Sequence, residues 1–335
     1  MNRRKLWSLG LAGLVVSSFV FAASCGDDDG GGLKKVTLML NWTPNTQHSG
    51  IYIAKEKGWY KDAGIDLQIL DAPASGGVEQ VVGQGKADFG ISVAESVIPA
   101  RAEGVPVVSI AAILQHNDSS LFSLAKANIK RPKDLEGKTY GGYGGPLETQ
   151  IVKKLVQCDG GDPAKVKFVE VGDVDYLAGM EAKQFDFVWV FEGWDVLRAN
   201  KIENKPVTSI KFKDWLNCIP DWYTPVFITS ESLAKSNPDL VKKFMAATSR
   251  GYDLAATESV TAADDLVKNA EGIDQRLVTE SAAYHLGKYV DKGRQWGLQD
   301  LAVWQTFATF LKDAGLYDKT VDVNKAFTND FLPKK

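Results

Sequence analysis

Short apolar runs alternate with stretches of helical spacing along most of the chain, and this alternation constrains the fold more than any single motif. In the first part of the chain, apolar runs predict strands at 36–40, 65–70, 88–92 and 107–112. Helical spacing between them predicts a helix that ends at Gly58 and further helices at 78–83 and 95–102. Such alternation is typical of an α/β fold with a mostly parallel sheet and helices on both faces.

A second series of the same kind begins near residue 129. Its predicted strands are 138–142, 166–171 and 187–191, and its predicted helices are 147–156 and 176–183. After a strand at 225–228 the pattern is helical, with helices starting at 237 and at 262–267, 277–286 and 301–312. Because the alternation restarts, we expect two lobes that are built alike.

The late helical segment is expected to pack back on the first lobe. The chain would then cross between the lobes twice, near residues 121–129 and 222–228. Two crossings form a hinge, and hinged lobes close around ligands. We therefore predict lobe 1 at 36–123 and 227–335 and lobe 2 at 124–226.

The first residues of the chain have the features of a secretory signal. Basic residues at 3–5 precede an apolar run at 6–23, and small residues lead to Cys25. We predict a signal peptide at 1–24 and lipidation of Cys25, although Ala22 stands where a lipobox usually has a large aliphatic residue. A plain signal peptide and an uncleaved anchor are the alternatives. The acidic, Gly-rich segment that follows predicts a flexible tether at 25–35.

The composition excludes several partners. A net charge of -3 and a pI near 5.8 argue against a nucleic-acid surface. The chain has three His, scattered along its length, and no motif of spaced metal ligands, so we expect no metal and no cofactor. Cys158 and Cys218 either pair in an oxidising compartment or remain two buried thiols.

The stretch 41–60 joins the first predicted strand to the first helix. It places Asn41, Trp42, Asn45 and His48 where a strand ends and a helix begins, which is where open α/β sheets bind ligands. An aromatic ring, amides and an imidazole without a nucleophile suggest recognition rather than chemistry. The chain also lacks the motifs of serine hydrolases, zinc proteases and phosphate-binding loops.

A second candidate set follows the predicted strand 187–191. Trp189, Glu192 and Trp194 lie there, beside Asp195. A carboxylate between indoles suits an aminated heterocycle, because it accepts paired N–H bonds while the rings stack. Two core tryptophans and a solvated acid are the alternative. Similarly, residues 221–223 either line a cleft or pack the hinge, and the Gly-rich segment 141–145 is either an anion cradle or a tight turn.

Several segments together resemble one family. They are 40–66, 85–92, 110–117, 135–148, 223–230 and 326–334. The chain resembles substrate-binding lipoproteins of ABC importers, in the branch that includes the thiamin-pyrimidine synthase and formylaminopyrimidine- and riboflavin-binding members. The resemblance implies a two-lobed periplasmic-binding-protein fold (type II-like) with the ligand in the interlobe cleft. It also implies a pocket formed by Asn41, Trp42, Tyr143, Trp189, Glu192, Trp194 and Tyr223.

The family that the chain resembles contains both an enzyme and receptors, so the residues that the enzyme needs can be looked for in this chain. The synthase needs a lysine for pyridoxal phosphate, a histidine and a Cys-rich run, but these positions fall on Ser92, Ser96 and residues 219–223, which contain no Cys. We therefore expect a monomeric receptor and not an enzyme. The resemblance implies that it is lipid-anchored on the extracytoplasmic side of the cell membrane. It would capture a thiamin pyrimidine or riboflavin and deliver it to an ABC permease and its ATPase.

Overall fold

The computed structural model describes residues 32–73, 77–172 and 174–334. The chain divides into two units, Met1–Gly32 and Leu33–Lys335, and both sheets belong to the second unit. The predicted signal peptide, the predicted lipidation site Cys25 and most of the predicted tether lie outside the described residues. No helix in the described part of the chain is long and apolar enough to span a membrane.

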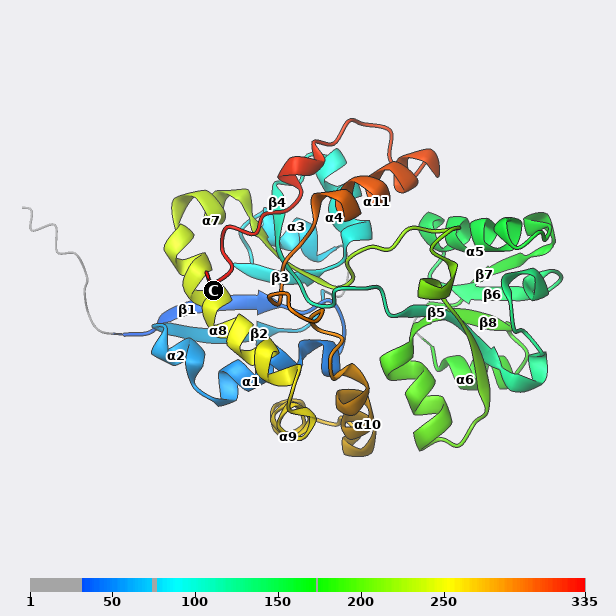
Figure 1. Ribbon diagram of the computed structural model, residues 1–335, viewed down its shortest axis with the longest axis horizontal. Helices are drawn as coiled ribbons and strands as arrows, with labels where there is room; N and C mark the ends of the chain where they lie inside the picture. The colour runs from blue at the N-terminus through cyan, green and yellow to red at the C-terminus, as the bar shows by residue number, and fades with distance from the viewer. Residues whose placement is uncertain (1–31, 74–76, 173, 335) are drawn as a thin grey trace, which may run out of the picture. The chain divides into compact units, whose positions relative to one another are not determined.

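The first sheet contains five strands (Figure 1). In spatial order they are β2 (Ile65–Leu70), β1 (Lys34–Met39), β3 (Phe89–Ser92), β10 (Val226–Ser230) and β4 (Val107–Ala112). β1 runs parallel to β2 and β3, whereas β10 runs antiparallel to β3 and β4.

The second sheet repeats this plan. Its strands in spatial order are β7 (Lys167–Glu170), β6 (Thr139–Gly142), β8 (Phe187–Phe191), β5 (Ser119–Leu124) and β9 (Val207–Lys211). β6 runs parallel to β7 and β8, whereas β5 runs antiparallel to β8 and β9. The predicted mostly parallel sheet is therefore wrong, since each sheet is mixed. β5 and β10 are the first strands after the chain crosses between the sheets, and no helix returns the chain in the parallel direction.

Helices cover both faces of the first sheet, because apolar side chains of its strands point to both sides. One apolar cluster joins β1 and β3 to α1 (Ser49–Glu56), α8 (Pro238–Ala255), α9 (Ser259–Asn269) and α10 (Gln275–His285). Another joins β4 and β10 to α3 (Val78–Gly83), α4 (Ala94–Ala102) and α11 (Leu301–Asp313). The short helices α2 (Trp59–Asp62) and α7 (Glu231–Ser236) complete this lobe. The prediction that the late helices pack on the first lobe is confirmed.

The second sheet is covered by α5 (Pro146–Cys158) and α6 (Tyr176–Glu181). Strand β8 shows why both faces are covered. Phe187 and Trp189 join the cluster that contains α5, whereas Val188 and Val190 join the cluster that contains α6. Side chains of β8 therefore alternate between the two faces of the sheet.

The two crossings between the sheets lie at residues 113–118 and 212–225. The first crossing was predicted near residues 121–129, and this position was wrong. Residues 119–124 form β5, which pairs along its length with β8 and β9. We therefore propose that lobe 2 begins near Ser119 and ends before Val226, rather than spanning 124–226. Asp221 joins the two crossings, since its carboxylate contacts His116 Nδ1 at 2.6 Å and accepts the backbone N–H of Asn117 at 3.0 Å.

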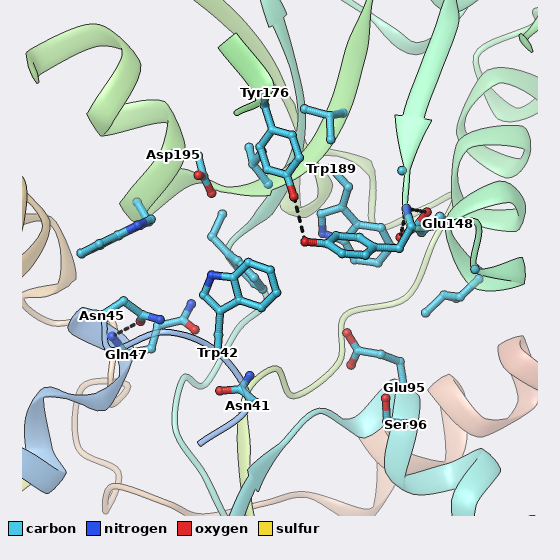
Figure 2. A pocket seen from close by; sticks show the side chains of 18 of the residues that line it. Asn41, Trp42, Asn45, Gln47, Glu95, Ser96, Glu148, Tyr176, Trp189 and Asp195 are labelled. Carbon is cyan, nitrogen blue, oxygen red and sulfur yellow. Dashed lines mark hydrogen bonds between the residues drawn. The ribbon is translucent and has the colours of Figure 1, made fainter. Parts of the chain in front are cut away.

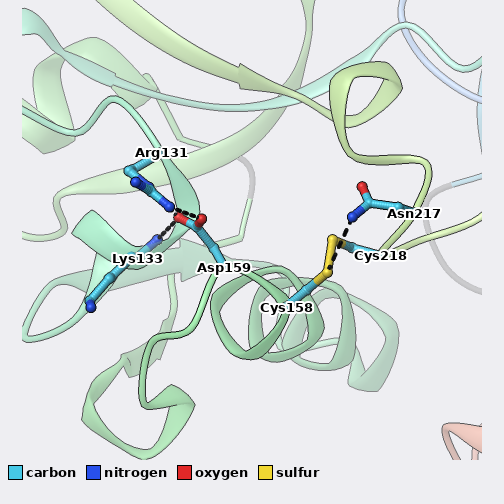
Figure 3. The surroundings of a disulfide bond; sticks show 6 residues. All are labelled: Arg131, Lys133, Cys158, Asp159, Asn217 and Cys218. Carbon is cyan, nitrogen blue, oxygen red and sulfur yellow. Dashed lines mark hydrogen bonds and ion pairs between the residues drawn. A yellow bond between two sulfur atoms is a disulfide. The ribbon is translucent and has the colours of Figure 1, made fainter.

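A disulfide links Cys158, at the end of α5, to Cys218 in the second crossing (Figure 3). The two Cα atoms are 5.7 Å apart, so the pairing left open by the sequence is a disulfide rather than two thiols. The neighbouring Asp159 accepts hydrogen bonds from the Arg131 side chain and from the backbone N–H of Lys133. These contacts hold the end of α5 against the segment that precedes β6 and against the second crossing.

Candidate functional site

A cavity of about 620 Å³ lies between the two sheets. Its walls come from segments that follow β1, β3, β6 and β8, and from α10 and α5 (Figure 2). These strands are the mutually parallel ones in their sheets, and their carboxyl ends all point to the cavity. The geometry therefore matches the general position of ligand sites in α/β proteins.

Two aromatic side chains from different lobes meet edge to face at the wall of this cavity. Trp42 follows β1 in the first lobe and Tyr143 follows β6 in the second, and their side chains are exposed to 40% and 44%. Their ring centroids are 6.1 Å apart with an interplanar angle of 87°. Tyr176 donates a hydrogen bond to the Tyr143 hydroxyl at 3.2 Å, which orients the second ring (Figure 2). Contiguous exposed apolar surface of this kind often marks a ligand-binding site.

The structure brings Asn41, Trp42, Tyr143, Trp189 and Trp194 to the cavity wall. Asn41 is held by a neighbour that does not line the cavity. The Nδ1 atom of His48 accepts the backbone N–H of Asn45, and its Nε2 lies 3.1 Å from Asn41 Oδ1, so Nε2–H donates to that oxygen. Burial lowers the pKa of His48 to about 3, so the ring is neutral. His48 therefore positions the loop.

Glu192 does not line the cavity, contrary to the prediction. Its side chain is only 6% exposed, and its Oε2 lies 3.3 Å from Lys211 Nζ on β9. The strand alternation ends at this residue because a π-helical turn, Glu192–Val196, begins there. Its backbone N–H donates to Asp118 O at 2.9 Å, which fixes the turn against the first crossing.

Tyr223 is also absent from the cavity wall. It is buried, its hydroxyl accepts the backbone N–H of Asp300 at 2.9 Å, and its ring lies 6.3 Å from that of Trp304. The neighbouring Trp222 stacks on Phe307 with ring centroids 4.7 Å apart. Of the two alternatives for residues 221–223, the structure has the packed hinge. Both aromatic side chains turn into the core between β10 and α11.

Three carboxylates lie in the cavity wall, and two of them, Glu95 and Glu148, were missed from the sequence. The three are Glu95 on α4, Glu148 on α5 and Asp195 in the turn after β8 (Figure 2). Glu95 accepts the indole N–H of Trp222 at 2.9 Å and lies 3.4 Å from the Thr224 hydroxyl. Burial raises the pKa of Glu95 to about 8 and that of Asp195 to about 6. An acid in the first turn of a helix looks like ordinary capping in a sequence, which is why Glu95 and Glu148 were not singled out.

Glu148 also explains the Gly-rich segment 141–145. Its carboxylate accepts the backbone N–H of Tyr143 at 3.0 Å (Figure 2). Hydrogen bonds from the backbone of Gly144 and Gly145 act on the same group, although burial still raises the pKa of Glu148. The amides expected to cradle an anion are therefore occupied by the chain's own acid. The segment is a tight turn, with Gly144 at a φ of +81° that a side chain would strain.

Arg198 is the only lysine or arginine among the described residues of the cavity wall. Its guanidinium is already engaged, at 3.0 Å from Asp175 and 2.8 Å from Glu203. In the described part of the chain no three metal-ligating side chains gather. The cavity thus offers aromatic faces and carboxylate acceptors, which suits recognition of a donor-bearing ring.

The chain belongs to the NMT1/THI5-like family, whose sequence profile, described as "NMT1/THI5 like", matches residues 45–262. A formylaminopyrimidine-binding protein from Halalkalibacterium halodurans is 25% identical over 93% of this chain and 96% of that protein. The riboflavin-binding protein RibY from Chloroflexus aurantiacus is 28% identical over 90% and 87%. A 4-amino-5-hydroxymethyl-2-methylpyrimidine phosphate synthase from Legionella pneumophila is 27% identical over 89% and 92%. The family predicted from the sequence is confirmed.

Among solved structures, the alkanesulfonate-binding protein SsuA from Xanthomonas axonopodis pv. citri has a TM-score of 0.68. The match covers 89% of this chain and 99% of that one at 14% sequence identity, so it concerns the fold alone. The predicted two-lobed periplasmic-binding-protein fold is confirmed.

Proposed function

We propose that this protein is the extracytoplasmic solute-binding component of an ABC importer and captures an aromatic N-heterocycle. The observation that carries the proposal is the pair Trp42 and Tyr143, which come from different lobes and meet edge to face at the wall of a cavity of about 620 Å³. Family membership and the formylaminopyrimidine- and riboflavin-binding relatives support it. The choice between a thiamin pyrimidine and riboflavin stays open.

In the proposed mechanism, the heterocycle stacks on Trp42 of the first lobe and on Trp189 or Trp194 of the second. Asn41 supplies hydrogen bonds from the first lobe. Glu95, Glu148 and Asp195 take the acceptor role that Glu192 was expected to have, because they line the cavity and Glu192 does not. Contacts from both walls favour the closed arrangement of the lobes, and the closed form docks on the permease. The partner ATPase supplies the energy.

The competing function is the synthase reaction named for one relative. Ser92, where the synthase is expected to have its lysine, is buried and donates a hydrogen bond to Glu79. Among the described residues of the cavity wall there is no lysine that could form a Schiff base. Residues 219–223 contain no Cys for iron. These observations favour a receptor, which we propose is monomeric and held at the membrane by lipidated Cys25.

The test is the thermal stability of the purified full chain with formylaminopyrimidine, hydroxymethylpyrimidine, thiamin or riboflavin. A ligand present at a hundred times its dissociation constant should stabilise the native state by about 2.7 kcal/mol. The variant Trp42→Ala should lose this stabilisation, whereas Trp59→Ala, an aromatic truncation outside the cavity, should keep it. If no heterocycle stabilises the wild-type chain, the proposed function is wrong.

A further inference from the structure

The ionisable side chains of the cavity wall are mostly acidic. Its carboxylates come from both lobes, with Glu95 on the first lobe and Glu148 and Asp195 on the second. Arg198, the only lysine or arginine of the described wall residues, is paired with two carboxylates of its own, Asp175 and Glu203. The wall therefore presents three carboxyl groups to a ligand, while Arg198 is already engaged.

The pKa values of the three wall acids respond to this environment. Burial raises the pKa of Glu95, Glu148 and Asp195, because the cost of removing each charge from water exceeds the opposing effect of nearby hydrogen bonds and, for Asp195, of Arg198. An opposite charge within a few ångström would favour the ionised forms. A cationic ligand provides that charge at the place where all three side chains meet the cavity.

A second, independent observation concerns His285, which also lines the cavity. Its side chain is 1% exposed, and its Nδ1 lies 2.8 Å from the carbonyl oxygen of Ser281, so Nδ1–H donates. Nε2 is then an acceptor, and it has no hydrogen-bond partner among the described residues. Burial lowers the pKa of His285, so the ring is neutral. An unpartnered buried acceptor at the wall calls for an N–H or O–H donor from the ligand.

The aromatic residues complete the pattern. The faces of Trp42 and the neighbouring indoles attract a cation that approaches a ring, and the attraction is larger when the site is shielded from water. We infer that the ligand of this cleft is an aromatic compound that carries a positive charge and offers N–H donors to the wall. The inference rests on the proposed receptor function and narrows it, because hydroxymethylpyrimidine and riboflavin are uncharged at neutral pH.

The experiment compares two ligands of equal shape by isothermal titration calorimetry with the purified full chain. One is thiamin, whose thiazolium ring is a permanent cation and whose aminopyrimidine donates N–H bonds. The other is 3-deazathiamin, in which an uncharged thiophene replaces the thiazolium. Thiamin should bind at least roughly tenfold more tightly, because hydrogen bonds and contacts to charged groups are the stronger ones.

Two variants locate the effect. Asp195→Asn and Glu95→Gln should each weaken thiamin binding by roughly tenfold and leave 3-deazathiamin within about threefold. Glu271→Gln, which removes an exposed carboxylate outside the cavity wall, should change neither. Equal affinity for the two ligands, or equal losses for both in the variants, would overturn the inference.

The outcomes separate this inference from the receptor function on which it rests. If hydroxymethylpyrimidine or riboflavin binds while thiamin does not, the receptor function stands and the charge inference falls. If neither the cation nor any neutral heterocycle binds, both are wrong.

Discussion

Gly193 and His285 are in contact across the two lobes. Gly193 follows β8 in the second sheet, and His285 ends α10 in the first lobe. A Cβ atom on Gly193 would lie 2.3 Å from His285 Cε1 and 2.8 Å from its Nε2. Ser281, one turn earlier on α10, donates a hydrogen bond to the Gly193 carbonyl oxygen. Only glycine lets the two lobes approach this closely.

Gly193→Ala should therefore push the lobes apart. Overpacking of a tight contact typically costs about 1–3 kcal/mol, and opening the hinge relieves it more easily than repacking α10. We expect a larger radius of gyration in small-angle X-ray scattering and a ligand affinity that falls by roughly tenfold. His285→Ala in the same chain makes room and should restore part of the compact radius of gyration. Unchanged scattering of Gly193→Ala would contradict this role.

The contact between His116 and Asp221 should make the hinge sensitive to pH. Asp221, at 2.6 Å, and Asp291, at 3.4 Å, raise the pKa of His116. The pair therefore stabilises the fold fully below the ordinary His pKa of about 6.5 and loses this effect as pH rises through the folded pKa. The His116 side chain is 65% exposed, so screening limits the contribution to less than about 1 kcal/mol.

The measurement is urea unfolding of wild type and His116→Asn at pH 6 and pH 9. The variant should be less stable than wild type at pH 6, and the difference should shrink at pH 9. An equal difference at the two pH values would show that the imidazolium does not contribute. Lys319→Gln, which removes an exposed ion pair with Glu103, serves as a control that does not titrate in this range.

The disulfide should contribute substantially to stability. Its two cysteines are separated by 60 residues, and a cross-link that closes a loop of this length stabilises by up to about 4 kcal/mol through the unfolded chain. Cys158→Ser with Cys218→Ser should lower the free energy of unfolding by about 2–4 kcal/mol. Wild type in reductant should match the double variant, and a reductant effect on the variant itself would point elsewhere.

Helices and strands with a regular apolar pattern could be predicted from the sequence. A strand whose pattern is interrupted by polar residues could not. β2, α3, β4 and β8 were predicted with the bounds that the structure has, because their apolar residues follow strand or helix spacing. β5 was missed because Ser119, Ser120 and Ser123 interrupt its apolar pattern, yet all six residues of the strand are buried. A central strand between β8 and β9 is covered on both faces, and no alternation marks it.

The aromatic residues of the cavity wall, with Asp195 beside them, were named from the sequence, whereas Glu95 and Glu148 were not. Trp42, Trp189 and Trp194 stand at strand ends, where a sequence pattern places side chains with some certainty. Glu192 was misplaced because the strand alternation was continued by one residue into a π-helical turn. Glu95 and Glu148 lie on helices of different lobes, and only the packing of the lobes brings both to one cavity.

Glu148 should position Tyr143 in addition to supplying charge. Its carboxylate accepts the Tyr143 backbone N–H at 3.0 Å, and the backbone of Gly144 and Gly145 also bonds to it. Glu148→Ala leaves these amides without their acceptor, so the turn that carries Tyr143 loosens. Hydrogen bonds to a charged acceptor are worth on the order of 1.5–3 kcal/mol, so amide hydrogen exchange at 143–145 should accelerate by roughly tenfold or more.

Glu148→Gln separates positioning from charge. Its amide oxygen still accepts from the turn, so exchange at 143–145 should stay near the wild-type rate, while affinity for a cationic ligand falls because the charge is gone. If Glu148→Ala leaves exchange at these amides unchanged, the acid does not hold the turn. Tyr143 would then owe its orientation to Tyr176 and to the loop itself, and Tyr176→Phe, which removes the hydroxyl that donates to Tyr143, would have the larger effect on binding.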